Sequence, residues 1–478
     1  MKNSEISKVL IAVACILVFA FLEPFGGLSR SAMLMIGIFI GVVYLWMASG
    51  ISWPSLFCLL ALAVLPEISM TSLITSSFGN SVIAFLIFSF CCSHALNETQ
   101  FTRRCALWFL SLRAAQKGAW AFMLIYFLSI LAIGSCMSTT VVVLIYLTIN
   151  EEIFSMLGLE KGNKFAAALT MGLVITASIS GAMTPIAHVF PLMALSTYAN
   201  LTGQAISYAA YMAAGIPAAL LAVLVMLLIF RFVLRPDTSA IRGIDIDSLK
   251  HSLTPADARE KATVAIFFGV VALWVLPELL KNVLPAAKWI SAQGTVMPPM
   301  LGTVLLCIIK VQNKPLLTLD AGAKSVPWPS IFMGASALAL GSALTNADIG
   351  LLKVVEQSIA PAADMFSGMT FILVLVALTA VMTNVGSNMV TVTVVCTVAL
   401  PVVAALSSLS INAGALAVVL GMMSTYAFAT PPAMTTVVLG TGSGWTTNAQ
   451  MAKYGFLFLI PCVLIVTLVA YPIAALLL

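Results

Sequence analysis

Long apolar segments follow one another along almost the whole chain, separated by short polar or basic loops. About 20 apolar residues are needed to cross the hydrocarbon core of a bilayer. We therefore expect an all-α polytopic membrane protein with about eleven transmembrane helices. They are predicted near residues 7–24, 31–48, 51–66, 79–96, 165–200, 206–234, 263–280, 289–309, 328–346, 411–446 and 450–477.

Two of these segments are interrupted by proline. "TASISGAMTPIAHVF" covers 176–190, and "STYAFATPPAMTT" covers 424–436. Proline lacks a backbone N–H and cannot continue a regular helix. Hydrocarbon tolerates broken backbone only where protein buries it or where it lines a wet cavity. Each segment is therefore predicted to be a broken helix that exposes backbone groups to a bound solute.

Two further apolar segments, 119–149 and 367–405, are too long for one helix and are rich in Ser, Thr and Gly. Each is predicted to be a re-entrant hairpin, which enters the membrane and returns to the same side. With a cytoplasmic N-terminus and an outside C-terminus, this topology puts 18 of the 22 Lys and Arg in inside loops. It thereby satisfies the positive-inside rule and indicates an integral plasma (inner) membrane protein.

Composition agrees with a membrane protein, because only 8% of residues are charged and 61% are hydrophobic. An ordinary soluble domain has roughly 25% charged residues. The net charge of +5 is not gathered on a soluble domain, so nucleic acid is not expected as a partner. Basic residues and Trp108 at helical spacing predict an amphipathic interfacial helix over 96–117.

A polar stretch over 235–262 is predicted to be a cytoplasmic linker between two halves of similar content. Scaffold helices are expected over 1–118 and 263–366. The hairpin, the broken helix and the following span form one repeat over 119–234 and another over 367–478. The first hairpin opens to the cytoplasm and the second to the outside, so the repeats are inverted. Paired interrupted segments of this kind indicate the midplane binding site of a transporter.

The hairpin tips carry short polar side chains, in "GSCMSTT" (134–140) and "TNVGSNM" (383–389). Half-helix N-termini attract anions, while free carbonyl and hydroxyl oxygens suit a small hard cation. No charged residue lies in the hairpins or the broken helices, so anion binding would rest on helix dipoles and a co-bound cation. A single Ser or Thr in a membrane helix usually bonds backbone or packs helices together. Recurrence of the cluster beside both breaks favours a binding site.

These motifs resemble the divalent anion/sodium symporter family of the ion transporter superfamily, whose hairpin tips read Ser-Asn-Thr and whose breaks contain Pro-Pro. "SNM" and "ATPP" match the second repeat well, and "STT" matches the first loosely. The similarity extends to "SSFGNSVIAFLIF" (76–88) and "VPWPSIFMGASALALGSAL" (326–344). It implies a homodimeric secondary transporter of small di- or tricarboxylates or sulfate, coupled to Na+ and working by an elevator mechanism. No organic cofactor is implied.

The resemblance also assigns roles to individual residues, and His188 joins them because it falls inside the first break. The expected substrate-binding residues are Ser138, Thr139, Thr140, His188, Ser387, Asn388, Met389, Thr430 and Pro431. The second sodium site is expected at Thr383, Gly386, Asn388 and Ala429. The first is expected at Gly134, Ser138 and Ala187.

This sequence departs from the family pattern in the first repeat and at the second tip. Thr139 stands where the family has Asn, and Met389 where it has Thr. The first break matches the family either at 187–190 or by pairing Thr184-Pro185 with Thr430-Pro431. An anion exchanger of the same fold, independent of sodium or linked to protons, is therefore the alternative function.

His188 has two interpretations. An intramembrane ionisable residue is a functional hypothesis by default, but a neutral His bonded to backbone is an equally good one. Intramembrane enzymes need paired carboxylates, a nucleophile–base dyad or His ligands at metal spacing. With three widely separated His and no acidic residue in the core segments, an enzyme is not expected. A channel is a further possibility, although paired hairpins favour alternating access.

Overall fold

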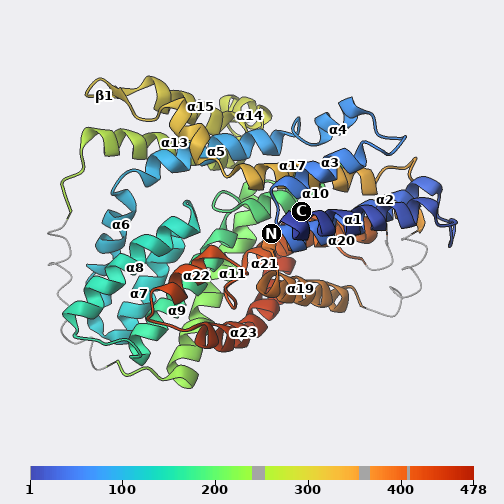
Figure 1. The fold of residues 1–478 in the computed structure, drawn as a ribbon. Helices are drawn as coiled ribbons and strands as arrows, with labels where there is room; N and C mark the ends of the chain where they lie inside the picture. The colour runs from blue at the N-terminus through green and yellow to red at the C-terminus, as the bar shows by residue number, and fades with distance from the viewer. Residues whose placement is uncertain (1, 239–252, 355–366, 406–409) are drawn as a thin grey trace.

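The computed structural model describes residues 2–238, 253–354, 367–405 and 410–478, so half of the predicted linker, with His251, lies outside the described residues. The described chain is nearly all helical (Figure 1), as predicted. Its one pair of strands is a small antiparallel hairpin of β1 (Lys310–Val311) and β2 (Lys314–Pro315).

The first half forms a series of helices whose lengths follow the apolar segments. They are α1 (Lys2–Phe21), α2 (Arg30–Ser49), α3 (Trp53–Leu62), α4 (Met70–Ser76), α5 (Ser81–Asn97), α6 (Phe101–Leu110), η1 (Ala115–Lys117), α7 (Ala119–Gly134), α8 (Thr139–Met156), α9 (Lys164–Met183), α10 (Val189–Thr202), α11 (Tyr208–Ile229) and the π-helical η2 (Phe230–Leu234).

The second half has a similar order. Its helices are α13 (Ala258–Leu280), α14 (Pro285–Ala292), α15 (Met297–Ile308), α16 (Leu319–Ser325), α17 (Trp328–Leu344), α19 (Gly368–Val385), α20 (Asn388–Ala405), α21 (Ala413–Thr425), α22 (Thr435–Gly442), α23 (Asn448–Ile465), the π-helical η5 (Val466–Ala470) and α24 (Tyr471–Leu477).

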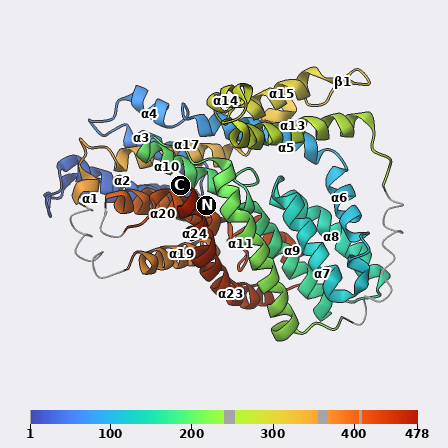
Figure 2. The same cartoon turned by 180° about the vertical axis from the view of Figure 1, so that it is seen from behind.

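The first group of helices consists of those in the segments predicted as scaffold, and this division into scaffold and repeats stays a prediction. Within the first group, α2 packs against α1 and α3, α3 against α17, and α5 against α13, α15 and α16. Helices α5, α13, α14 and α15 occupy the upper part of both views (Figure 1, Figure 2), with α7, α8, α9, α19 and α23 below them. Helices α9 and α21 are enclosed by the others, since every residue of α21 from Gly414 to Thr425 is buried.

Seven helices of the described chain are long and apolar enough to cross a membrane, or nine if two bent pairs count as one span each. The two predicted hairpins are present as the helix pairs α7–α8 and α19–α20, each joined by a short tip. The total of eleven spans and the return of each hairpin to its own side stay predictions.

Three predicted segments differ from the structure. The predicted span 289–309 is wrong as one helix, because α14 and α15 meet at 90°. Gly294 (φ +78°) turns the chain, and Pro298 and Pro299 occupy the start of α15, where proline is tolerated. The predicted span 51–66 is shortened to α3. The interfacial helix predicted over 96–117 is divided among the end of α5, α6 and η1.

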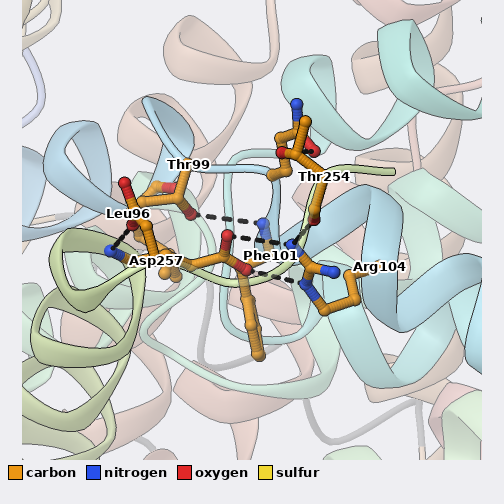
Figure 3. Close-up of polar contacts among 8 residues, drawn as sticks. Leu96, Thr99, Phe101, Arg104, Thr254 and Asp257 are labelled. Carbon is orange, nitrogen blue, oxygen red and sulfur yellow. Dashed lines mark hydrogen bonds and ion pairs between the residues drawn. The ribbon is translucent and has the colours of Figure 1, made fainter. Parts of the chain in front are cut away.

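Adjacent arginines connect α6 to two different helices. Arg104 donates from Nε and Nη2 to the carboxylate of Glu260 on α13, at 2.9 and 3.1 Å, and from Nη2 to the Thr254 carbonyl (Figure 3). Arg103 donates to both carboxylate oxygens of Glu152 on α8, at 2.8 Å each. Helix α6 therefore links the first hairpin to the scaffold helix α13.

The far end of the first hairpin is joined to the second repeat at Trp445. The indole Nε1 of Trp445 donates to Glu151 at 2.6 Å, and its ring meets the Phe154 ring edge to face with centroids 4.5 Å apart. Lys161 places its ammonium 3.8 Å from the centroid of the same ring and donates to the Ser443 carbonyl at 2.7 Å. These contacts hold the two repeats together outside the site.

Candidate functional site

Both predicted broken helices are present. The first break separates α9 from α10 at residues 184–188, and the second separates α21 from α22 at 426–434. Helix α10 packs against α20 and α21, while α22 packs against α8 and α9. Each broken helix therefore contacts the hairpin of the other repeat, and both tips come close to both breaks.

Asn384 supplies hydrogen-bond partners to backbone groups of the second break that have no partner within a helix. Its side-chain oxygen accepts from the backbone N–H of Phe428 and of Ala429, both at 2.9 Å. Its amide nitrogen donates to the carbonyls of Tyr426 (2.7 Å) and Ala380 (2.9 Å). Asn384 is fully buried, so one side chain replaces the helical partners of three backbone groups in the break. Asn384 was not among the predicted site residues, although it lies within the tip motif "TNVGSNM".

Each break is anchored to a hairpin tip by a threonine hydroxyl. This shared contact decides how the residues of the first break align with those of the second. The Thr430 hydroxyl donates to the backbone carbonyl of Asn384, three residues before the tip serine Ser387. The Thr184 hydroxyl donates to the backbone carbonyl of Ser135, three residues before Ser138. This correspondence pairs Thr184-Pro185 with Thr430-Pro431.

A pair of close glycine contacts supports the same register. A Cβ atom at Gly215 of α11 would lie 2.6 Å from the carbonyl oxygen of Met183. A Cβ atom at Gly455 of α23 would lie 2.7 Å from Cα of Ala429. In each repeat, the helix that follows the broken helix (α11 or α23) thus lies close to the residue just before the Thr-Pro pair. A glycine in that helix allows the close approach. In this register Met183, rather than Ala187, corresponds to Ala429.

A cavity of about 410 Å³ opens between the tips and the breaks. Six of the nine predicted substrate-binding residues line it, namely Thr140, His188, Ser387, Asn388, Met389 and Pro431. The other three, Ser138, Thr139 and Thr430, are in the same tips and break but are not among its lining residues. The rest of the wall was not predicted and consists of Ile51, Phe190, Ser330, Pro432, Ala433, Met434, Thr435 and Val438.

The electrostatic character of the cavity comes from backbone. No Asp, Glu, Lys or Arg is among its described lining residues. Helices α8, α10, α20 and α22 all begin beside it, and the cap residues Ser138 and Met434 make no side-chain capping bond to α8 and α22. The first N–H groups of a helix have no partner within the helix and carry a partial positive charge. The cavity is therefore suited to an anion.

His188 is bonded to backbone and lies on the cavity wall. Its Nδ1 accepts from the backbone N–H of Val189 at 3.1 Å, and its ring lies against Phe190 with centroids 4.1 Å apart. An imidazole whose Nδ1 accepts a hydrogen bond carries its proton on Nε2 when neutral. His188 is thus bonded to backbone and, on the cavity wall, also offers an N–H donor.

The side chain of Asn388 lies among three oxygen atoms. With its nitrogen turned toward them, it donates to Thr383 Oγ1 (3.2 Å), to the Thr383 carbonyl (3.0 Å) and to the Ala433 carbonyl (2.7 Å). With its oxygen turned toward them, four oxygens would converge, and a cation would have to balance them. Carbonyl and hydroxyl oxygens beside a broken helix are sodium ligands in transporters. The structure thus brings together Thr383 and Asn388 of the expected second sodium site and adds Ala433.

The remaining expected sodium ligands are less closely connected. The backbone N–H of Ala429 is bonded to Asn384, and Gly386 ends α19 at the tip. In the first repeat Gly134 faces α9, where an added Cβ would lie 2.2 Å from Ser180 Oγ. The hydroxyl of Ser135 donates locally to the Ala132 carbonyl, so it does not reproduce the amide of Asn384.

Comparison with known proteins connects this architecture to a family. A family model described as "Citrate transporter" (CitMHS) matches residues 10–423. The chain belongs to the citrate transporter family. The resemblance to divalent anion/sodium symporters inferred from the motifs is confirmed, and the protein is a membrane transporter.

Two individual proteins are similar to this member of the citrate transporter family. It is 23% identical over 397 residues to the sodium-dependent dicarboxylate transporter SdcS of Staphylococcus saprophyticus, covering 77% of this chain and 72% of that relative. It matches the crystal structure of the YdaH transporter of Alcanivorax borkumensis with a TM-score of 0.57 at 12% identity, over 92% of this chain and 98% of the other. That match confirms the transporter fold.

The citrate transporter family model covers both hairpin tips and the first break but ends within α21. The second break, with Pro431-Pro432 and six of the 14 residues that line the cavity, lies beyond the matched residues. The family assignment therefore rests on the rest of the chain, and the geometry of the second break is independent support for a binding site.

Proposed function

We propose that the protein is a secondary active transporter of small di- or tricarboxylates or sulfate, coupled to sodium. The observation that carries the proposal is the uncharged cavity at four helix starts, directly beside the oxygen cluster of Asn388. The name of the relative SdcS, a sodium-dependent dicarboxylate transporter, supports both the substrate class and the ion.

Charge balance explains why a cation would be required. A dianion in a membrane-embedded cavity loses hydration, which is costly unless an opposite charge is near. No cationic side chain is among the described residues of the wall. Helix starts supply only partial charge, so bound sodium at Thr383, Asn388 and Ala433 would provide the rest. Each ligand would then increase the affinity for the other.

The arrangement of helices also supports an elevator mechanism. Most of the cavity belongs to the two repeats, while Ser330 comes from α17 and Ile51 from the connection between α2 and α3, all within the segments predicted as scaffold. In our proposal the joined repeats move past that scaffold, which is held in a homodimer. The alternative remains a sodium-independent or proton-linked exchanger of the same fold.

Uptake into proteoliposomes tests the proposal. We would measure uptake of succinate, citrate, tartrate and sulfate with an inward gradient of sodium or of choline, and counterflow of each anion without a gradient. Symport predicts that uptake of at least one anion requires sodium. Equal uptake with choline would favour the exchanger, and failure to carry any of these anions would contradict the proposed substrate class.

A substitution of Asn388 tests whether sodium binds among the oxygen atoms around its side chain. Asn388→Ala should raise the sodium concentration for half-maximal uptake about tenfold or more, which corresponds to about 1.4 kcal/mol. Asn200→Ala is the matched control, because Asn200 lies in α10 outside the cavity and bonds to Asn80. Sodium dependence unchanged by Asn388→Ala would remove Asn388 from the ion site.

A further inference from the structure

Three apolar side chains form part of the cavity wall. Met389 follows Asn388 in the first turn of α20, and Phe190 lies at the start of α10. Val438 is three residues after Thr435, so both lie on one face of α22. These three side chains are all hydrophobic and have no polar group to offer a ligand.

Polar groups line the cavity at the tips and at His188, and the hydroxyl-bearing residues Ser330 of α17 and Thr435 of α22 also belong to its wall. The hydroxyls of Thr140 and Ser387 stand at the two tips, beside the starts of α8 and α20. The Nε2–H of His188 is available because Nδ1 is bonded to backbone. A ligand bound here would thus meet hydrogen-bond donors at the tips and at His188, and hydrocarbon where it lies against Met389 and Phe190.

We infer that the transported anion has an apolar body, such as an alkyl-substituted dicarboxylate, and that hydroxylated acids such as tartrate and citrate are poorer substrates. This inference rests on the proposed function and narrows its substrate class. A hydroxyl group placed against Met389 or Phe190 would lose its hydrogen bonds to water and gain none from these two side chains. A methyl group in the same place would be removed from water, with a gain of about fourfold in affinity per buried carbon.

A series of dicarboxylates with equal charge and similar length tests the inference. We would compare succinate, methylsuccinate, 2,2-dimethylsuccinate and tartrate in sodium-driven uptake, as substrates and as competitors. The expected order of affinity is dimethylsuccinate, methylsuccinate, succinate and then tartrate, with about tenfold or more between the first and the last. Tartrate binding as tightly as dimethylsuccinate would overturn the inference while leaving the proposed function intact.

Substitution of Met389 assigns the preference to a side chain. Met389→Thr should lower the dimethylsuccinate-to-tartrate affinity ratio about fourfold or more, since it replaces part of the apolar wall by a hydroxyl group. Met389→Leu keeps an apolar side chain of similar volume and should keep the ratio. A ratio unchanged in Met389→Thr would contradict our assignment. If none of the four acids were carried or competed, the proposed function would fail and this inference with it.

Discussion

The hydroxyl of Thr430 donates to the backbone carbonyl of Asn384, so the second break is fastened to the second hairpin tip by a contact that spans 46 residues of sequence. The side chain of Asn384 reinforces this contact by bonding to Tyr426, Phe428 and Ala429. The tip and the break are therefore held together, and a substitution that displaces one of them should displace the other.

Replacement of Asn384 should be among the most damaging single changes in the chain. Asn384→Ala would leave two N–H groups and one carbonyl of the buried break without partners, at about 1–3 kcal/mol each. We expect a lower melting temperature in detergent and loss of uptake. Ser135→Ala, at the corresponding position of the first repeat, removes only local bonds, to the Ala132 carbonyl and the Cys136 sulfur, and should have a small effect. Equal effects of the two substitutions would show that the amide of Asn384 does not support the break.

His188 should act as a neutral donor. Protonation of Nδ1 would break its bond with the Val189 N–H, so we expect affinity for sulfate to change little from about pH 8 to about pH 6. His188→Gln keeps a donor, whereas His188→Phe removes it and should weaken binding about tenfold or more, as for a bond to a charged group. Tighter sulfate binding on acidification, absent in His188→Gln, would instead show that the imidazole takes up a proton.

The re-entrant hairpins can be tested by cysteine labelling. In a background lacking the nine native Cys, Ser155→Cys and Glu160→Cys follow the first hairpin and should react only with a reagent on the cytoplasmic side. Ser367→Cys precedes the second hairpin and should react only from outside. All three positions are exposed in the structure. Labelling of residue 155 or 160 from outside would make the first hairpin a single crossing.

The ion pair between Arg104 and Glu260 should matter for coupling α6 to α13. Arg104→Glu or Glu260→Arg alone places like charges together and should lower both uptake and melting temperature, while the double exchange should recover at least half of each loss. The expected coupling energy is about 0.5–3 kcal/mol. Lys281→Ala is a suitable control, because its pair with Glu278 is more exposed and such pairs contribute little. Additive effects in the double variant would show that the contact does not link the helices.

Features encoded by consecutive residues were predictable from the sequence. The Pro431-Pro432 break follows from backbone chemistry, and the hairpin pairs follow from length and from the Lys and Arg distribution. The bend between α14 and α15 was missed because hydropathy alone joined the two helices, although Gly294 and Pro298 marked it locally.

Features that depend on distant segments were not predictable. Asn384 acts on a break more than 40 residues away, and a single sequence does not show which polar side chain of a tip faces the protein and which faces the cavity. Ile51 is apolar and lies just before α3, and Ser330 is small and polar and lies at the start of α17. Both are far in sequence from either repeat. Nothing in their neighbours distinguishes them from residues of an ordinary scaffold.

These two residues have a consequence for the direction of transport. Of the 14 residues that line the cavity, only Ile51 and Ser330 lie outside the two repeats. If the repeats, joined at Trp445, move as one body, every other contact travels with the anion. Any difference in the affinity for the anion between the two membrane faces would then come from contacts with Ile51 and Ser330, which the anion makes at one face only. They would set the rates of uptake and release relative to each other, while the ion gradient alone sets how far the anion accumulates.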